Sequence, residues 1–229
     1  MTKKHPFLIA ILSLLLFACG KNNDDPNNAN CGPGGNNEDG AGDGIEEVFV
    51  IPSTVGTYWV YQWYQVTFDG EETMLSRIDS VYVSGDSLIG GELFTVHKGS
   101  FFFPEYQLIS RDSSGYFIDQ NRDVLFSYLN FTDTLDSGPQ GDFLSWYTKM
   151  YDYQLVNVPA GTFLAIEARK FLYRPSGDPV NACGDQEVEL GYFYSDGVGM
   201  VQAQTGYFGP IQACDYYEEA RLIRYYIAP

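Results

Sequence analysis

The sequence offers one histidine for acid–base chemistry once residues 1–18 are set aside. His97 lies in the run 94–98, whose β-branched and aromatic residues are typical of a strand. A Ser-His-Asp enzyme would have to use this histidine, but no Gly-x-Ser-x-Gly turn accompanies it. A zinc site of His and Cys ligands would lack the usual spacing. We therefore expect an ordinary strand histidine, and we predict no metal and no cofactor.

Paired carboxylates are the second group that could do chemistry. Glycoside hydrolysis needs two carboxyl groups about 5–10 Å apart across a cleft. Adjacent residues of a strand point to opposite faces, so neighbours in sequence do not form such a pair. We treat these acids as surface charges, with a carboxylate-dependent hydrolase of envelope or extracellular glycans as the alternative function. The pairs are Glu46–Glu47, Glu71–Glu72, Glu187 with Glu189, and Glu218–Glu219.

The cysteines suggest an exported protein. Cys183 and Cys214 both lie in polar, loop-like surroundings, and an oxidising compartment favours a disulfide between them. Closing a loop of that length would stabilise the fold by roughly 3–4 kcal/mol in the entropic model. A metal pair is the alternative, although no histidine lies near either cysteine in sequence. Cys31 is then left free or linked to another molecule.

Aromatic side chains are the candidates for binding. Trp59 and Trp63 share one face of an expected strand, and exposed flat rings suit stacking on sugars or peptides. The alternative, which we favour, is that both fill the core. The run Phe101-Phe102-Phe103 cannot point all three rings one way, so at least one ring should lie exposed, and Phe102 is the representative candidate.

The first residues resemble a secretion signal. Lys3 and Lys4 precede a short apolar run that is too short to span a bilayer permanently, and a small residue, Ala18, precedes Cys19. The sequence Leu16-Phe17-Ala18-Cys19 resembles the lipobox of bacterial lipoproteins. That resemblance implies cleavage of a signal peptide of residues 1–18 and a membrane anchor of several acyl chains on Cys19. A plain signal cut after Ala18 is the alternative.

Residues 19–44 form the expected tether. Gly, Asn and Asp dominate it, and no aromatic residue could seed a core, so we expect the segment to be disordered. The run Lys21-Asn22-Asn23-Asp24-Asp25 resembles the acidic export signal of surface-exposed Bacteroidota lipoproteins. It implies an anchor in the outer membrane and exposure at the cell surface.

The net charge narrows the range of partners. The whole chain carries −17, and losing Lys3 and Lys4 with the signal would lower this by two, to −19. Such an acidic chain is a poor partner for nucleic acid or for an anionic lipid surface. We therefore expect no nucleic acid partner, and contact with the membrane through the lipid on Cys19.

Residues 45–229 predict a single all-β domain. Tyr58–Phe68 alternates two sets of aromatic and β-branched residues, and Asp69-Gly70 then predicts a hairpin. Gly85-Asp86 predicts another turn, and Pro159-Ala160-Gly161 predicts a bulged three-residue turn in a long hairpin. We expect one large, curved antiparallel sheet, as a half-barrel, barrel or sandwich. The other expected strands are Thr73–Val83, Glu92–Lys98, Tyr106–Arg111, Tyr116–Asp119, Val124–Leu129, Trp146–Val158, Thr162–Tyr173, Glu189–Tyr194, Met200–Gln204 and Tyr216–Ile227.

Three motifs resemble a group of uncharacterised β-rich envelope lipoproteins. They are Gly-x-Tyr-Trp-Val-Tyr at 56–61, Val-Pro-Ala-Gly-Thr-Phe at 158–163 and Gly-Val-Gly-Met-Val at 197–201. The resemblance implies architecture and carries no catalytic residue. We expect a non-enzymatic domain that binds a protein, a glycan or a lipid. Carriage of an apolar ligand inside the sheet would need a cavity of several hundred Å³, and a filled interior would exclude it.

The lipobox prediction is tested at Cys19. Replacing Cys19→Ser should release the protein from the membrane fraction or block its processing, because serine cannot receive the thioether-linked lipid. Protease treatment of intact cells should digest the wild-type domain while a periplasmic control survives. Unchanged fractionation of the variant would refute the anchor, and protection of the domain until the outer membrane is opened would refute surface exposure.

Overall fold

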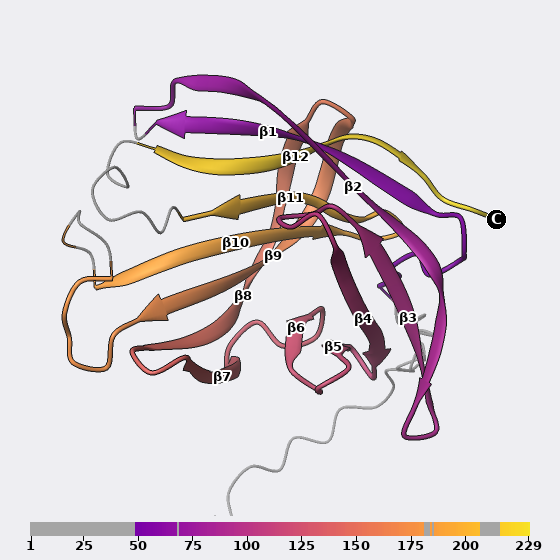
Figure 1. Ribbon diagram of the computed structural model, residues 1–229, viewed down its shortest axis with the longest axis horizontal. Helices are drawn as coiled ribbons and strands as arrows, with labels where there is room; N and C mark the ends of the chain where they lie inside the picture. Colours follow the sequence, from indigo (N-terminus) through magenta and orange to yellow (C-terminus); the bar gives the residue numbers. More distant parts are fainter. Residues whose placement is uncertain (1–48, 68, 181–183, 185, 207–215) are drawn as a thin grey trace, which may run out of the picture. The chain divides into compact units, whose positions relative to one another are not determined.

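The computed structural model describes residues 49–67, 69–180, 184, 186–206 and 216–229 (Figure 1). The predicted signal peptide, Cys19 and the tether lie outside these residues. The described part contains twelve strands and no helix, so it holds no helix long and apolar enough to cross a membrane. The strands are β1 (Tyr58–Thr67), β2 (Glu72–Ile89), β3 (Glu92–Gly99), β4 (Tyr106–Ser113), β5 (Tyr116–Asp119), β6 (Val124–Ser127), β7 (Thr134–Gln140), β8 (Leu144–Val158), β9 (Gly161–Tyr173), β10 (Glu187–Ser195), β11 (Gly199–Thr205) and β12 (Tyr216–Tyr226).

All twelve strands belong to one antiparallel, barrel-like sheet, which confirms the predicted fold class. Its order is β6-β5-β4-β3-β2-β1-β12-β11-β10-β9-β8-β7. Two six-stranded meanders, β1–β6 and β7–β12, are therefore joined by the ladder between β1 and β12. Among the described strands, no ladder pairs β6 with β7. The backbone N–H of Val124 in β6 donates instead to the carboxylate of Asp136 in β7, at 2.8 Å. We call this unpaired junction the seam.

The predicted strands are largely confirmed, with three corrections at turns and edges. The predicted turn at Gly85-Asp86 is wrong, because β2 continues through it and only its register with β3 shifts, between Val83 and Gly85. The chain turns instead at Gly90 and Gly91, whose φ angles of 60° and 85° suit a two-residue hairpin loop.

The other two corrections concern β7, β8 and β9. The long β8–β9 hairpin is confirmed, but Val158 pairs directly with Gly161, so its loop has two residues rather than three. Strand β7 was not predicted. It contains Gly138 and Pro139, which weaken a strand signal and are tolerated because β7 lies at an edge of the sheet.

The β8–β9 hairpin bends across its neighbours. Its register shifts between Tyr151 and Gln154, and beyond that point the hairpin crosses the C-terminal strands steeply (Figure 1). The turn residue Ala160 donates a backbone hydrogen bond of 3.0 Å to the carbonyl of Leu222 in β12. The bend thus ties the end of the hairpin to the strand that joins the two meanders.

Alternation along β1 builds the core as predicted. Trp59, Tyr61 and Trp63 point to one face and are all buried, and Leu222 of β12 pairs with Tyr61. The indole N–H of Trp63 donates to the buried carboxylate of Asp79 at 2.8 Å, and Arg77 pairs with the same carboxylate at 2.8 Å. The polar groups that enter this core are therefore compensated.

Truncating the junction between the meanders should be costly. Leu222 is fully buried, so Leu222→Ala should lower the free energy of unfolding by about 2–5 kcal/mol through lost burial and a cavity. Leu155→Ala is the matched control, because Leu155 is 70% exposed and its loss should cost no more than about 0.5 kcal/mol. Urea unfolding of both variants measures the difference. Equal, small effects would mean that the β1–β12 region contributes little to the cooperative core.

Candidate functional site

The interior of the curved sheet is not filled. A cavity of about 320 Å³ lies between β8–β11 on one side and β4–β6 with the segment 101–102 on the other. Apolar side chains make much of its wall, and they include Phe101, Leu108, Leu125, Ala168 and Met200. Its volume is in the range that we required from the sequence for a carrier of apolar ligands, a cavity of several hundred Å³.

Three tyrosines line this cavity, Tyr106 from β4 and Tyr192 and Tyr194 from β10. Their phenol groups are enclosed by protein, and the accessible surface that the rings keep faces the cavity. Burial raises the pKa of Tyr192 to about 12. Burial, reinforced by neighbouring tyrosines, raises the pKa values of Tyr106 and Tyr194 further.

The three hydroxyls therefore stay protonated and can donate. Within the described residues, none of them makes a hydrogen bond to another protein group. Tyr61, which lines the smaller neighbouring cavity, differs in this respect, because its hydroxyl donates to the carbonyl of Met200 at 2.9 Å. Half-buried hydroxyls without protein partners can bind water or a ligand, so they mark the polar points of a binding cavity.

One end of the cavity is charged. Lys170 of β9 lies with its ammonium 3.8 Å from the ring centre of Trp146 in β8. Burial lowers the pKa of Lys170, although Asp123, Asp136 and Asp119 oppose the shift. None of the described carboxylates lies within ion-pair distance of this ammonium. Its three N–H groups are therefore available to a ligand.

The three acids at the charged end of the cavity, Asp119, Asp123 and Asp136, make different contacts. Asp119 accepts hydrogen bonds from the backbone of Asn121 and Asp123, and Asp136 accepts them from Val124 and Ser137. Both therefore hold local backbone. The carboxylate of Asp123 makes no hydrogen bond to another described residue, and it lines the cavity directly. Burial, with Asp119 and Asp136 nearby, raises the pKa of Asp123.

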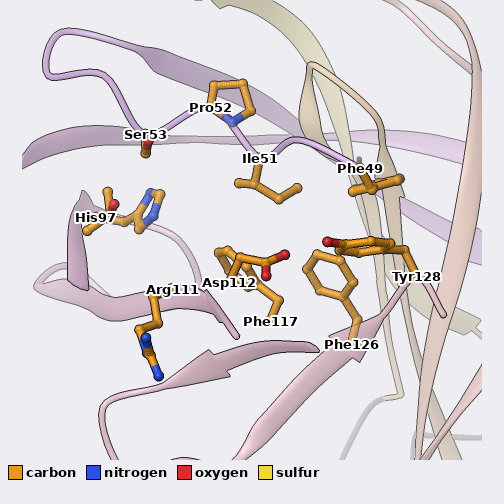
Figure 2. A pocket seen from close by; sticks show the side chains of 11 residues that line it. Phe49, Ile51, Pro52, Ser53, His97, Arg111, Asp112, Phe117, Phe126 and Tyr128 are labelled. Carbon is orange, nitrogen blue, oxygen red and sulfur yellow. The ribbon is translucent and has the colours of Figure 1, made fainter. Parts of the chain in front are cut away.

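Two smaller cavities continue the interior toward the N-terminal segment. One of about 70 Å³ shares Tyr106, Leu108, Tyr194 and Met200 with the large cavity. The next, of about 140 Å³, shares Ile51, His97 and Phe117 with the small one. Figure 2 shows the last of these, with His97 on one side and Phe49, Phe126 and Tyr128 on the other. The three cavities thus form a series with common walls.

Residues 49–53 cover the end of this series. The backbone N–H of Val50 donates to the carboxylate of Asp196 at 2.6 Å, and its carbonyl accepts from Gly197 at 2.9 Å. The ring of Phe49 stacks on Tyr128 with centroids 5.5 Å apart. The segment that follows the predicted tether is therefore built into the wall of the domain.

The structure places the two candidate tryptophans in the core. Trp59 is 4% exposed, and its indole N–H donates to the carbonyl of Val198 at 2.6 Å. Trp63 is fully buried between Phe101 and Phe102. Neither offers an exposed face for stacking, because the inward register of β1 points both rings at the core. The core position that we favoured from the sequence is the one observed.

Phe102 lies at the cavity. It is half-buried, packs edge-on against Trp63 and lines the large cavity, and its φ of 64° turns the chain so that the next ring points away. Phe103 is accordingly the exposed member of the run, at 70%. Phe102 therefore remains a candidate contact for a ligand inside the sheet.

Three of the paired glutamates form ion pairs: Glu72 and Glu219 both bind Arg221, and Glu189 binds Arg169, which also holds the buried Glu167. The prediction of surface charges is wrong at Glu219, which is 6% exposed and is compensated by Arg221. Glu46 and Glu47 lie outside the described residues, as do Cys183 and Cys214. Within the described part, no group of three His, Cys, Asp or Glu residues is placed to hold a metal ion.

Apart from Phe102, sequence reasoning missed the residues that line the cavity. The signal was nevertheless present, because Tyr192 and Tyr194 alternate along β10 and Ala168 and Lys170 alternate along β9. A lysine in register with buried residues of one strand face can be recognised as an inward-pointing charge.

Comparison with known proteins gives a limited set of similarities. No protein-family model matches the sequence, and no curated protein matches it significantly. A predicted exported protein with a YmcC-like fold from Bacteroides fragilis aligns over 78% of this chain and 99% of its own, with 15% identity and a TM-score of 0.47. A predicted lipoprotein from Parabacteroides distasonis aligns over 78% and 98%, with 11% identity and a TM-score of 0.44.

The buried histidine at the cavities should make stability depend on pH. Burial lowers the pKa of His97 from 6.5 to about 4, so the unfolded chain binds a proton more readily than the folded domain. The stability that the neutral ring allows is present above pH 6.5 and is lost as pH falls toward 4, by roughly 3 kcal/mol.

Urea unfolding across this pH range tests the effect. His97→Phe should be less sensitive to acid than the wild type, whereas Lys98→Gln, at an exposed neighbouring position, should keep the wild-type slope. Parallel pH profiles for the wild type and His97→Phe would show that His97 is protonated as easily in the folded domain as in the unfolded chain.

Proposed function

We propose that this chain is a lipid-anchored envelope protein whose β domain binds a small, largely apolar ligand inside its sheet, without catalysing a reaction on it. The observation that carries the proposal is the cavity lined by three enclosed tyrosines whose hydroxyls lack protein partners. The sequence left a protein, a glycan or a lipid as the expected partner. The proposal restricts this choice to a ligand small enough to enter the fold.

The size of the cavity suits such a ligand. An engineered apolar cavity of about 150 Å³ is enough to bind benzene, and natural ligand sites begin at about 300 Å³. At about 320 Å³ the cavity has room for a ligand larger than a single ring. The smaller cavities behind Tyr106 and Tyr194 offer an apolar tail further space along Trp59 and Ile51.

The hydrolase alternative has its best position at Asp123. This carboxyl lines the cavity, and its raised pKa would suit a general acid. A hydrolase also needs a second carboxylate free to act as base or nucleophile. The nearest acids, Asp119 and Asp136, accept hydrogen bonds that hold their own turns, which favours a structural role for both.

The proposed anchor gives this binding site a location. A lipid on Cys19, followed by the tether, would hold the domain within reach of the outer membrane. An amphiphile that leaves or enters that membrane would then be available to the cavity at high local concentration.

Filling the cavity should abolish binding. Phenylnaphthylamine, an apolar probe whose fluorescence rises in a dry site, should bind the wild-type domain. Ala168→Leu should weaken this binding at least about tenfold, because Ala168 lines the cavity and is 1% exposed. Leu108→Phe, from the opposite wall, is a second variant should the first fail to fold.

The control adds similar bulk outside the cavity. Leu164→Phe lies on the same strand as Ala168 at a position 55% exposed, and it should bind the probe as the wild type does. Circular dichroism checks that each variant is folded. Probe binding that persists in a folded cavity-filling variant, or that is absent from the wild type, would overturn the proposal.

A further inference from the structure

The polar end of the large cavity has a composition that selects among ligand head groups. Lys170 supplies one ammonium, whereas Asp119, Asp123 and Asp136 act on it as three carboxylates. The nearby Arg122 does not restore the balance, because it is 69% exposed and pairs with Glu92. The end of the cavity is therefore negative overall, although its only described cation is directed at the ligand space.

The excess of negative charge disfavours an anionic head. A carboxylate or phosphate brought to Lys170 would gain one ion pair, but it would also meet the half-buried carboxylates of Asp119 and Asp136 and the exposed carboxylate of Asp123. A fatty acid is therefore a poor fit, even though a cavity lysine is the feature that would first suggest one.

A cationic head fits no better. The face of Trp146, the natural contact for an ammonium, is already covered by Lys170 at 3.8 Å. A second ammonium would lie against the first. Among the three acids that could attract it, Asp119 and Asp136 have their carboxylate oxygens engaged by backbone N–H groups and by the side-chain amide of Asn121. The third, Asp123, is exposed, so solvent screens its charge.

The polar groups that line the cavity would be matched by an uncharged head group with both hydrogen-bond donors and acceptors. The ammonium of Lys170 can donate only, and the carboxylate of Asp123, when ionised, can accept only. The hydroxyls of Tyr192 and Tyr194 deeper in the cavity can donate to a carbonyl oxygen. Adjacent hydroxyls on a ligand could bind Lys170 and Asp123 at once, and the half-buried ammonium of Lys170 would then find a partner.

On these grounds, and resting on the proposed function, we infer that the cavity binds a neutral amphiphile with a polyhydroxyl head, of the monoacylglycerol or alkyl glycoside kind. Lys170 and Asp123 determine its specificity. The apolar chain lies among Phe102, Leu108 and Met200, and the head lies at the end near the seam, beside Trp146.

Competition with phenylnaphthylamine tests the inference with probes of equal chain length. Monodecanoyl glycerol or decyl glucoside should displace the apolar probe at least about tenfold more strongly than decanoate or decylamine, all used below their micelle concentrations. The stronger of the two neutral ligands tells whether the head is a glycerol or a sugar. Decanoate or decylamine binding as tightly as both neutral ligands would overturn the inference.

The variant Lys170→Met distinguishes binding of the ligand's head group from binding of its apolar chain. This variant keeps the length of the side chain and removes its donors, so it should weaken binding of the preferred neutral ligand about tenfold relative to binding of phenylnaphthylamine. Lys149→Met is the matched control, because Lys149 lies on β8 outside the cavity lining and should leave both ligands unaffected. Asp123→Asn should strengthen decanoate binding relative to the neutral ligand.

The outcomes also separate this inference from the proposed function. Binding of phenylnaphthylamine with no preference among heads, or a preference that survives in Lys170→Met, would overturn the inference and leave the cavity as an apolar site. Failure of the wild-type domain to bind any of these compounds would overturn the proposed function itself.

Discussion

The ladder between β1 and β12 is the constraint on which the rest of the structure depends. Ten residues of β1, Tyr58–Thr67, pair with β12, which brings the first and last strands of the domain together. The backbone N–H of Ala228 extends the junction by donating to the hydroxyl of Thr57 at 3.1 Å. Without this ladder, each meander would be an open sheet with one apolar face exposed. The interior cavity exists because the ladder makes the two meanders face each other.

The size of the residues along the inner face explains why that interior is not filled. Across five strands the lateral neighbours are Trp63, Ala220, Ala203, Tyr192 and Ala168, so small side chains separate the bulky rings. The alanines let the sheet curve tightly, whereas the rings keep the opposite walls apart. The tyrosine rings that separate the walls carry hydroxyl groups at their ends. Polar points therefore stand inside an otherwise apolar space, an arrangement that suits a binding site better than a core.

Most strands could be predicted from the sequence, because a strand pattern lies within a few consecutive residues. The cavity could not be predicted, because it depends on contacts between residues far apart in the chain. The alternation of Trp59, Tyr61 and Trp63 gave the inward face of β1, and the turns at Asp69-Gly70 and Pro159-Ala160 gave two hairpins. The turn predicted at Gly85 is instead an irregularity within β2, because glycine is common both in turns and in β-bulges. The distance between the walls depends on the β1–β12 pairing, which joins residues far apart in the chain. Lys170 shares a strand face with the buried Ala168, but alternation along β9 alone does not reveal that a cavity lies on that face.

The seam lies beside the large cavity. Val124 and Leu125 of β6 and Trp146 of β8 line the cavity beside the junction at which the ladder is interrupted. Paired strands are joined by a row of backbone hydrogen bonds, whereas the described bond between β6 and β7 runs from Val124 to the carboxylate of Asp136 and is worth about 1.5–3 kcal/mol. Strand β6 is also held by Phe126, which is 1% exposed and stacks on Tyr194. The head-group end of the cavity lies at this same place. A polar head held by Lys170 and Asp123 would therefore lie beside the seam. The interruption of the sheet and the charged end of the cavity thus coincide: the ladder is missing where the apolar interior ends in the groups able to hold a polar head.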